Sequence, residues 1–167
     1  DLVYEIDKEN FKNVEDPEMP ENLRHAFRLF LIESALLSYD FKGKARAKDK
    51  VELTSMMVHA ERLIFVNDIY LRWLKSYNNN IMHDLDKNEE ETIEDFKKIF
   101  LDVKPKLASY FTIFPDFQEV IEKINDCVLE ELEFWFVAGK EDSEVNWKRC
   151  SHHILVGGQK LDRGFTV

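Results

Sequence analysis

The sequence predicts an all-α domain, a bundle of four to five main helices around a central hydrophobic helix, with an extended N-terminal arm and a C-terminal extended tail or small β-hairpin. Residues 56–74 are almost continuously apolar and contain no Gly or Pro, and a helix that is apolar on nearly every side must lie inside a protein. The chain has only five Gly and four Pro, which favours long helices over tight turns. Apolar residues between 93 and 114 recur in steps of three and four, the spacing of one helical face.

The length of 167 residues fits a single domain. We expect an extended arm over residues 1–20, a helical bundle over residues 21–138, and a short helix followed by an extended or hairpin tail over residues 139–167. The arm is expected because apolar and polar residues alternate near the N-terminus, which is typical of a strand.

The first two helices can be placed from their ends. The first is expected over residues 21–41, because Pro20 suits a first helical turn and Gly43 can adopt the left-handed conformation that often ends a helix. The central helix is expected over residues 49–77, because the three Asn at 78–80 favour a turn.

The third helix is expected to begin near Asn88, a suitable N-cap. Pro105 predicts a kink or a break, because proline removes a helical hydrogen bond. The apolar stripe keeps its phase across this proline, so both halves should face the same core. The stripe consists of Ile93, Phe96, Phe100, Val103, Leu107, Tyr110 and Phe114.

The last long helix is expected over residues 117–138 and should end at Gly139. A short helix over residues 143–150 would follow, with Trp147 as its anchor. Gly157 and the glycine after it separate β-branched and apolar residues, a pattern that favours a hairpin turn. An apolar tail that docks in a groove is the alternative.

The chain carries a net charge of −10, which disfavours a general binder of nucleic-acid backbones. Acidic residues gather before and within the third helix and along the last helix. Such surfaces can lie free in water or attract a basic partner. The residues predicted to form an acidic partner-binding face are Glu89, Glu90, Glu91, Glu119, Glu122, Asp126 and Glu130.

One basic segment, residues 42–50, interrupts this acidic chain. Its cations occupy every second position, so an extended backbone would direct all of them to the same side. The segment is therefore a candidate for binding phosphate, nucleic acid or an anionic surface, and the alternative is a solvated loop. The candidate anion-binding residues are Lys42, Lys44, Arg46, Lys48 and Lys50.

Motifs with established chemistry are missing from the sequence. It contains no glycine-rich phosphate-binding loop, no dinucleotide-binding motif and no serine-hydrolase elbow. Neither Cys127 nor Cys150 belongs to a C-x-x-C pair, and no His has an acid three residues before it, as the helices of di-metal bundles require. We therefore predict no catalytic residue, no cofactor and no metal site.

The histidines allow two narrower hypotheses. His59 is expected to be a hydrogen-bonded core residue, and the alternative is a general base that acts with Glu33 or Glu61. His152 and His153 could bind a metal together with Cys150, but adjacent side chains diverge in any regular element.

Residues 78–83, Asn-Asn-Asn-Ile-Met-His, resemble the R-x4–6-H motif of HEPN nucleases. These are small all-α domains in which a dimer brings Arg and His together to cut RNA. The resemblance covers six residues of 167. Asn78 stands at the position of the Arg and lacks its positive charge. The resemblance therefore implies a degenerate HEPN-like, RNA-associated protein in place of an active nuclease.

The function that we favour from the sequence is a non-catalytic acidic helical module that binds a protein, as an adaptor, regulator or inhibitor. The alternatives are contact with nucleic acid or an anionic surface through residues 42–50, and the HEPN-like role. No apolar run is long enough to cross a membrane, and with only two Cys this favours an intracellular protein of the cytoplasm or nucleus. A homodimer formed through the termini is also possible.

Overall fold

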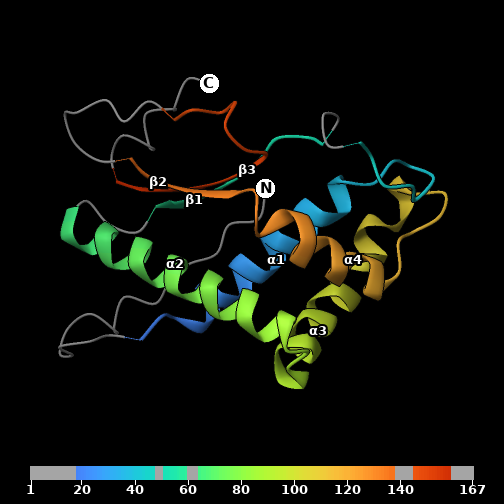
Figure 1. The fold of residues 1–167 in the computed structure, drawn as a ribbon, viewed down its shortest axis with the longest axis horizontal. Helices are drawn as coiled ribbons and strands as arrows, with labels where there is room; N and C mark the ends of the chain where they lie inside the picture. The colour runs from blue at the N-terminus through green and yellow to red at the C-terminus, as the bar shows by residue number, and fades with distance from the viewer. Residues whose placement is uncertain (1–17, 48–50, 60–63, 138–144, 159–167) are drawn as a thin grey trace.

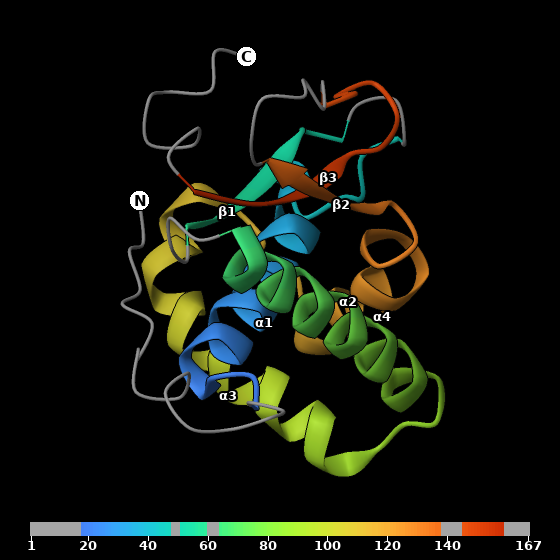
Figure 2. The same cartoon turned by 90° about the vertical axis from the view of Figure 1, so that its left-hand side faces the viewer.

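The computed structural model describes residues 18–47, 51–59, 64–137 and 145–158. The fold is mixed α/β, so the all-α prediction is wrong. The elements follow one another as α1 (Glu21–Leu37), β1 (Thr54–His59), α2 (Ile64–Asp86), α3 (Glu90–Leu107), the 3-10 turn η3 (Ala108–Tyr110), α4 (Phe117–Lys123), the π-helical segment η4 (Ile124–Val128), β2 (Leu132–Val137) and β3 (His152–Gly157). Figures 1 and 2 show the three strands together on one side of the molecule and the helices gathered on the other.

The three strands form a parallel sheet in the order β1-β3-β2. Every residue of β3 is buried, as expected for a middle strand that is covered on both faces. The predicted hairpin at Gly157 is therefore wrong, because this residue ends β3 beside β2. A Cβ atom at Gly157 would lie 2.2 Å from the carbonyl oxygen of Val137, so the glycine permits a close approach of two strands.

The predicted central helix is also wrong in its first part. Residues 54–59 form the edge strand β1, and α2 begins only at residue 64. A short apolar run without alternation does not distinguish a strand from a buried helix, which explains the error. The three Asn do not stop α2, because Asn78 is buried within it and its amide contacts the sulfur of Met82 at 3.6 Å.

The helix expected over residues 117–138 is divided between α4, η4 and β2. Its second part, Leu-Glu-Phe-Trp-Phe-Val, is rich in the aromatic residues that favour strands. No helix is present at residues 145–150, the described part of the short helix that we expected. The N-terminal arm before residue 18 and the tail after residue 158 lie outside the described residues.

The other helix predictions are closer to the structure. The helix expected over residues 21–41 begins where predicted but ends at Leu37. In the third, Pro105 lies inside α3, which continues for two residues and then tightens into η3. The stripe is buried at Phe96, Phe100 and Val103, whereas Tyr110 is 72% exposed because the change in winding turns it outward.

The core lies between the sheet and the helices, and α1 occupies its middle (Figure 1). Phe27, Leu31, Ile32 and Ala35 of α1 are fully buried, and the helix packs against α3, α4 and η4. The central hydrophobic helix of this fold is therefore α1. None of the described helices is long and apolar enough to cross a membrane.

Candidate functional site

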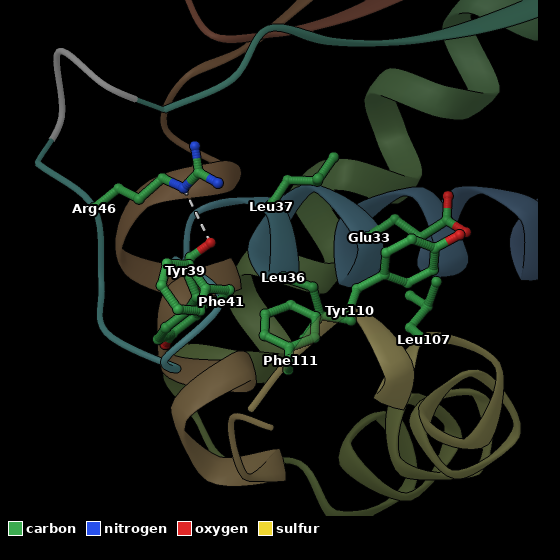
Figure 3. A pocket seen from close by; sticks show the side chains of 9 residues that line it. All are labelled: Glu33, Leu36, Leu37, Tyr39, Phe41, Arg46, Leu107, Tyr110 and Phe111. Atoms are coloured by element: carbon green, nitrogen blue, oxygen red, sulfur yellow. Dashed lines mark hydrogen bonds between the residues drawn. The ribbon is translucent and has the colours of Figure 1, made fainter. Parts of the chain in front are cut away.

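A pocket of about 410 Å³ opens between the second half of α1, the turn that follows it, and the end of α3 with η3 (Figure 3). We call it the α1–η3 pocket. Its volume is typical of pockets that hold small molecules or single side chains of a partner. Its lining is mostly apolar and consists of Glu33, Leu36, Leu37, Tyr39, Phe41, Arg46, Leu107, Tyr110 and Phe111.

The turn at residues 40–44 forms one wall of this pocket. The carboxylate of Asp40 accepts hydrogen bonds from the backbone N–H groups of Lys42 at 2.8 Å and Lys44 at 2.9 Å. The bond from Lys44, more than any other interaction, lowers the pKa of Asp40. Gly43 has φ +70°, and a Cβ atom there would lie 2.6 Å from the carbonyl oxygen of Ile113. The tight turn therefore depends on an aspartate and a glycine.

Arg46 lies at one end of the pocket, and its guanidinium is engaged by other groups. Its Nε donates to the carbonyl oxygen of Tyr39 at 3.0 Å, and its Nη1 pairs with the carboxylate of Glu52 at 2.9 Å. The hydroxyl of Tyr39 in turn donates to the carbonyl oxygen of Glu119 at 3.0 Å, which fixes the turn to α4. At this end of the pocket, the positive charge of Arg46 is therefore neutralised by Glu52, and hydrogen bonds to backbone carbonyls hold the turn in place.

Glu33 lies at the other end, where its side chain extends toward Tyr110 and Leu107 (Figure 3). It also lines a smaller hollow of about 200 Å³ between α1 and α3. Burial raises the pKa of Glu33, because the charged carboxylate loses water. In the part of the chain that the structure describes, no hydrogen bond or ion pair reaches this carboxylate. The smaller hollow is lined by His25, Leu29, Glu33, Ile99, Asp102, Val103, Lys106 and Leu107.

The rim of the α1–η3 pocket is unusually apolar. Of the seven large apolar side chains that are exposed among the described residues, three line it: Leu37 at 41%, Phe41 at 59% and Tyr110 at 72%. A fourth, Ile113 at 64%, has its backbone against the turn at Gly43. The backbone N–H of Thr112 donates to the carbonyl oxygen of Phe41, so the two sides of the rim are joined. A contiguous exposed apolar patch of this kind marks an interaction site in many soluble proteins.

The predicted acidic residues lie on two segments of the fold, the start of α3 and the stretch from α4 to residue 130. Asn125 donates to the carboxylate of Asp86 at 3.1 Å, which brings the Asp126 segment close to the corner before α3 that carries the three glutamates 89–91. At the other end of α4, the carboxylate of Glu119 accepts the backbone N–H of Asp116 in a capping box, and Glu122 accepts from Gln118. Glu119, Glu122, Asp126 and Glu130 are all exposed.

The basic segment is only partly described, because Lys48 and Lys50 lie outside the described residues. Lys42 and Lys44 are exposed on the tight turn, and Arg46 is paired with Glu52. Residues 41–43 form a turn, so the continuous extended backbone that this prediction assumed is not observed.

A buried polar cluster at the start of the sheet was not predicted. The hydroxyl of Thr54 lies 2.9 Å from the hydroxyl of Ser34 and 2.7 Å from Nδ1 of His152, so it links α1, β1 and β3. Burial lowers the pKa of His152 to about 4. Ser34 and His152 are almost completely buried, so this cluster holds elements together and is closed to a substrate.

The neighbouring histidine is also neutral and buried. Nδ1 of His153 accepts from the indole N–H of Trp135 at 3.0 Å, and its Nε2 lies 3.1 Å from the carbonyl oxygen of Cys150. Burial lowers the pKa of His153 and raises the pKa of the Cys150 thiol, so this is not an activated thiolate and imidazolium pair. Among the described residues, no group of three or more His, Cys, Asp or Glu is placed to hold a metal ion.

The remaining histidine hypotheses find little support in the geometry. His59 is exposed at the end of β1, so the prediction of a core histidine is wrong. No residue of β1 lines either hollow that contains Glu33, and Glu61 lies outside the described residues. The fold that the HEPN resemblance implied is not observed, and Asn78 and His83 both lie within α2, the first buried and the second exposed.

Sequence reasoning missed the α1–η3 pocket as a site. The useful signal was Glu33, an acid within the apolar run Leu-Phe-Leu-Ile-Glu-Ser-Ala-Leu-Leu of α1. An ionisable side chain in such a run needs water or a partner, because burial of an unpaired charge is costly. Its position therefore indicated an opening in the core.

Comparisons with known proteins give one result. No curated protein and no solved structure matches the chain. The family model of the Z1 domain matches residues 22–167, which include all the helices and strands of the described residues except Glu21, the first residue of α1, and the whole α1–η3 pocket. The chain therefore belongs to the Z1 domain family.

Proposed function

We propose that this Z1 domain is a non-catalytic protein-interaction module and that the α1–η3 pocket receives an apolar segment of its partner. The observation that carries this proposal is the combination of a pocket of about 410 Å³ with three exposed apolar side chains in its lining, Leu37, Phe41 and Tyr110. Free exposure of such a surface costs stability and solubility, and a bound apolar segment would remove it from water.

The acidic surface supports a basic partner. A net charge of −10 attracts positively charged proteins over several ångströms and raises the rate of encounter more than the final affinity. The exposed acids at Glu89, Glu90, Glu91 and Asp126 lie on the corner near Asp86, away from the pocket lining, so we assign them to this long-range attraction. Partner binding should therefore weaken as salt concentration rises.

Contact with nucleic acid or an anionic surface through residues 42–50 is the second candidate. It is less favoured because Arg46 is already paired with Glu52. The HEPN-like role is less favoured because its all-α scaffold is not observed. An intracellular location agrees with the free thiol of Cys150.

A peptide selection tests the proposal. Twelve-residue peptides selected from a random display library against the intact chain would be measured for affinity with the native protein and two variants. Leu37→Asp places a charge at the pocket rim, whereas Leu101→Asp places the same charge on an exposed leucine of α3 that lines neither hollow.

Peptides that bind the pocket should lose at least about tenfold in affinity with Leu37→Asp, since one desolvated charge costs at least about 1.4 kcal/mol. They should bind Leu101→Asp as they bind the native protein. Equal affinity for all three proteins would contradict the proposed site. Replacement of both Lys42 and Lys44 by Ala tests the second candidate with a short RNA, and unchanged binding would remove it.

A further inference from the structure

We infer that Glu33 is the receptor for a positively charged side chain of the bound segment, an ammonium or guanidinium group that enters the α1–η3 pocket beside an apolar residue. This inference rests on the proposed function and deepens it. It assigns to the partner a lysine or arginine next to an aliphatic or aromatic side chain.

The position of Glu33 supports this role. It is shared by the linings of both the α1–η3 pocket and the smaller hollow, so its carboxylate lies where the two spaces meet. The pocket lining is mostly apolar, and Figure 3 shows Glu33 at the same end as Tyr110 and Leu107. A long cationic side chain places its methylene groups along such walls and its charge at the end.

Among the described residues, no cationic side chain forms an ion pair with Glu33, and the positive charge of the chain's N-terminus partly offsets the effect of burial on its pKa. Arg46 is bound to Glu52 and to the backbone of Tyr39 at the far end. Lys106 lies on the lining of the smaller hollow, but neither it nor Arg46 forms an ion pair with Glu33. Asp102 of the same lining adds a second acid. An anion would therefore be repelled here, and a cation would be attracted.

Partial burial of Glu33 strengthens its preference for a cationic ligand. Removal of water raises the pKa of Glu33, so the free domain holds this carboxylate in an unfavourable environment. An incoming cation favours the charged form, and a pair in low dielectric interacts more strongly than a pair on the surface. A partly buried carboxylate in apolar surroundings is thus able to select cationic over neutral ligands of the same shape.

Two small probes test this selection: 4-phenylbutylamine, whose four-carbon ammonium chain matches a lysine, and the uncharged 4-phenylbutan-1-ol. Binding to the full chain would be followed by nuclear magnetic resonance shifts of the pocket residues. The amine should bind at least about tenfold more tightly than the alcohol to the native protein. Glu33→Gln should remove this preference, so that the amine and the alcohol bind this variant with similar affinity.

Glu94→Gln is the matched control. Glu94 is an exposed glutamate of α3 that pairs with Lys97 at 3.0 Å and lines neither hollow. This variant should keep the preference for the amine. Equal binding of amine and alcohol to the native protein, or a preference that survives Glu33→Gln, would overturn the inference. If the alcohol still lost affinity with Leu37→Asp, the proposed function would stand. If neither probe shifted the pocket residues, both would fall.

Discussion

The hydroxyl of Thr54, which contacts two buried side chains, allows a quantitative test of how the sheet is joined to α1. Its oxygen lies 2.9 Å from the hydroxyl of Ser34 on α1 and 2.7 Å from Nδ1 of His152 on β3. Thr54→Val keeps the shape of the side chain and removes both hydrogen bonds. The variant therefore isolates the polar contribution of this one atom.

The expected cost follows from the burial of the two partners. Ser34 is 1% exposed and His152 is 2% exposed, so water does not replace the lost bonds. A buried polar group without a partner costs about 1–3 kcal/mol. Because the hydroxyl of Ser34 can rotate, we expect about 2–4 kcal/mol in total, a large part of the roughly 5–15 kcal/mol that stabilises a domain.

Urea unfolding followed by tryptophan fluorescence measures this cost directly. Ser34→Ala and the double variant with Thr54→Val complete a double-mutant cycle. The double variant should cost less than the sum of the two single variants, because it leaves only His152 without a partner. Thr112→Val, at an exposed threonine, is the matched control and should stay within about 0.5 kcal/mol of the native protein.

A loss of less than about 0.5 kcal/mol for Thr54→Val would refute the proposed link between α1 and the sheet. Additive effects in the cycle would refute the claim that the two hydroxyls act as one chain. A change in the denaturant dependence with no change in midpoint would point instead to an altered unfolded state.

Three further predictions follow from other contacts. Burial lowers the pKa of His152 to about 4, so between pH 6.5 and pH 4 the unfolded chain binds a proton at this residue and the folded chain does not. As the pH falls over this range, the free energy of unfolding measured in urea titrations should therefore fall by up to about 3 kcal/mol. A free energy of unfolding that does not change with pH would contradict a neutral, buried His152 ring. Gly157→Ala should lower the melting temperature by at least about 6 °C, because the added Cβ would collide with the backbone carbonyl of Val137. An unchanged melting temperature would disprove this close contact between β3 and β2. Gly43→Ala should lower the affinity of the pocket for 4-phenylbutan-1-ol several-fold without unfolding the domain. The reason is that Gly43 has φ +70° and lies against the carbonyl of Ile113, so the added methyl group forces the turn to move. An unchanged affinity would show that the turn does not shape the pocket.

The helices were predictable because their signals are local. The start of α1 follows Pro20, and Asp116 caps α4 at the predicted position. The buried stripe of α3 was visible in the spacing of Phe96 and Phe100. Each of these signals spans a few residues, the range over which capping and the helical period act.

The sheet was not predictable in the same way. Thr54 pairs with His152, and the two are 98 residues apart. β3 is buried at every position without alternation, since both faces are covered, and both β1 and β3 are only six residues long. Parallel pairing leaves no turn between partners in the sequence, so neither period nor turn chemistry marks it. The wrong central helix and the wrong hairpin both arise from this missing information.

The candidate site has one feature that could be predicted from local sequence and one that could not. Its lining comes from α1, from the turn at residues 40–44 and from η3, and their meeting is non-local, so no single stretch predicts the pocket. Glu33 is different, because one carboxylate inside an apolar helix indicates locally that the core must open there. The conspicuous acidic runs offered no such constraint, since exposed acids need nothing beyond water. An isolated charge on an apolar face is thus a stronger indicator of a binding site than a cluster of charges on a polar one.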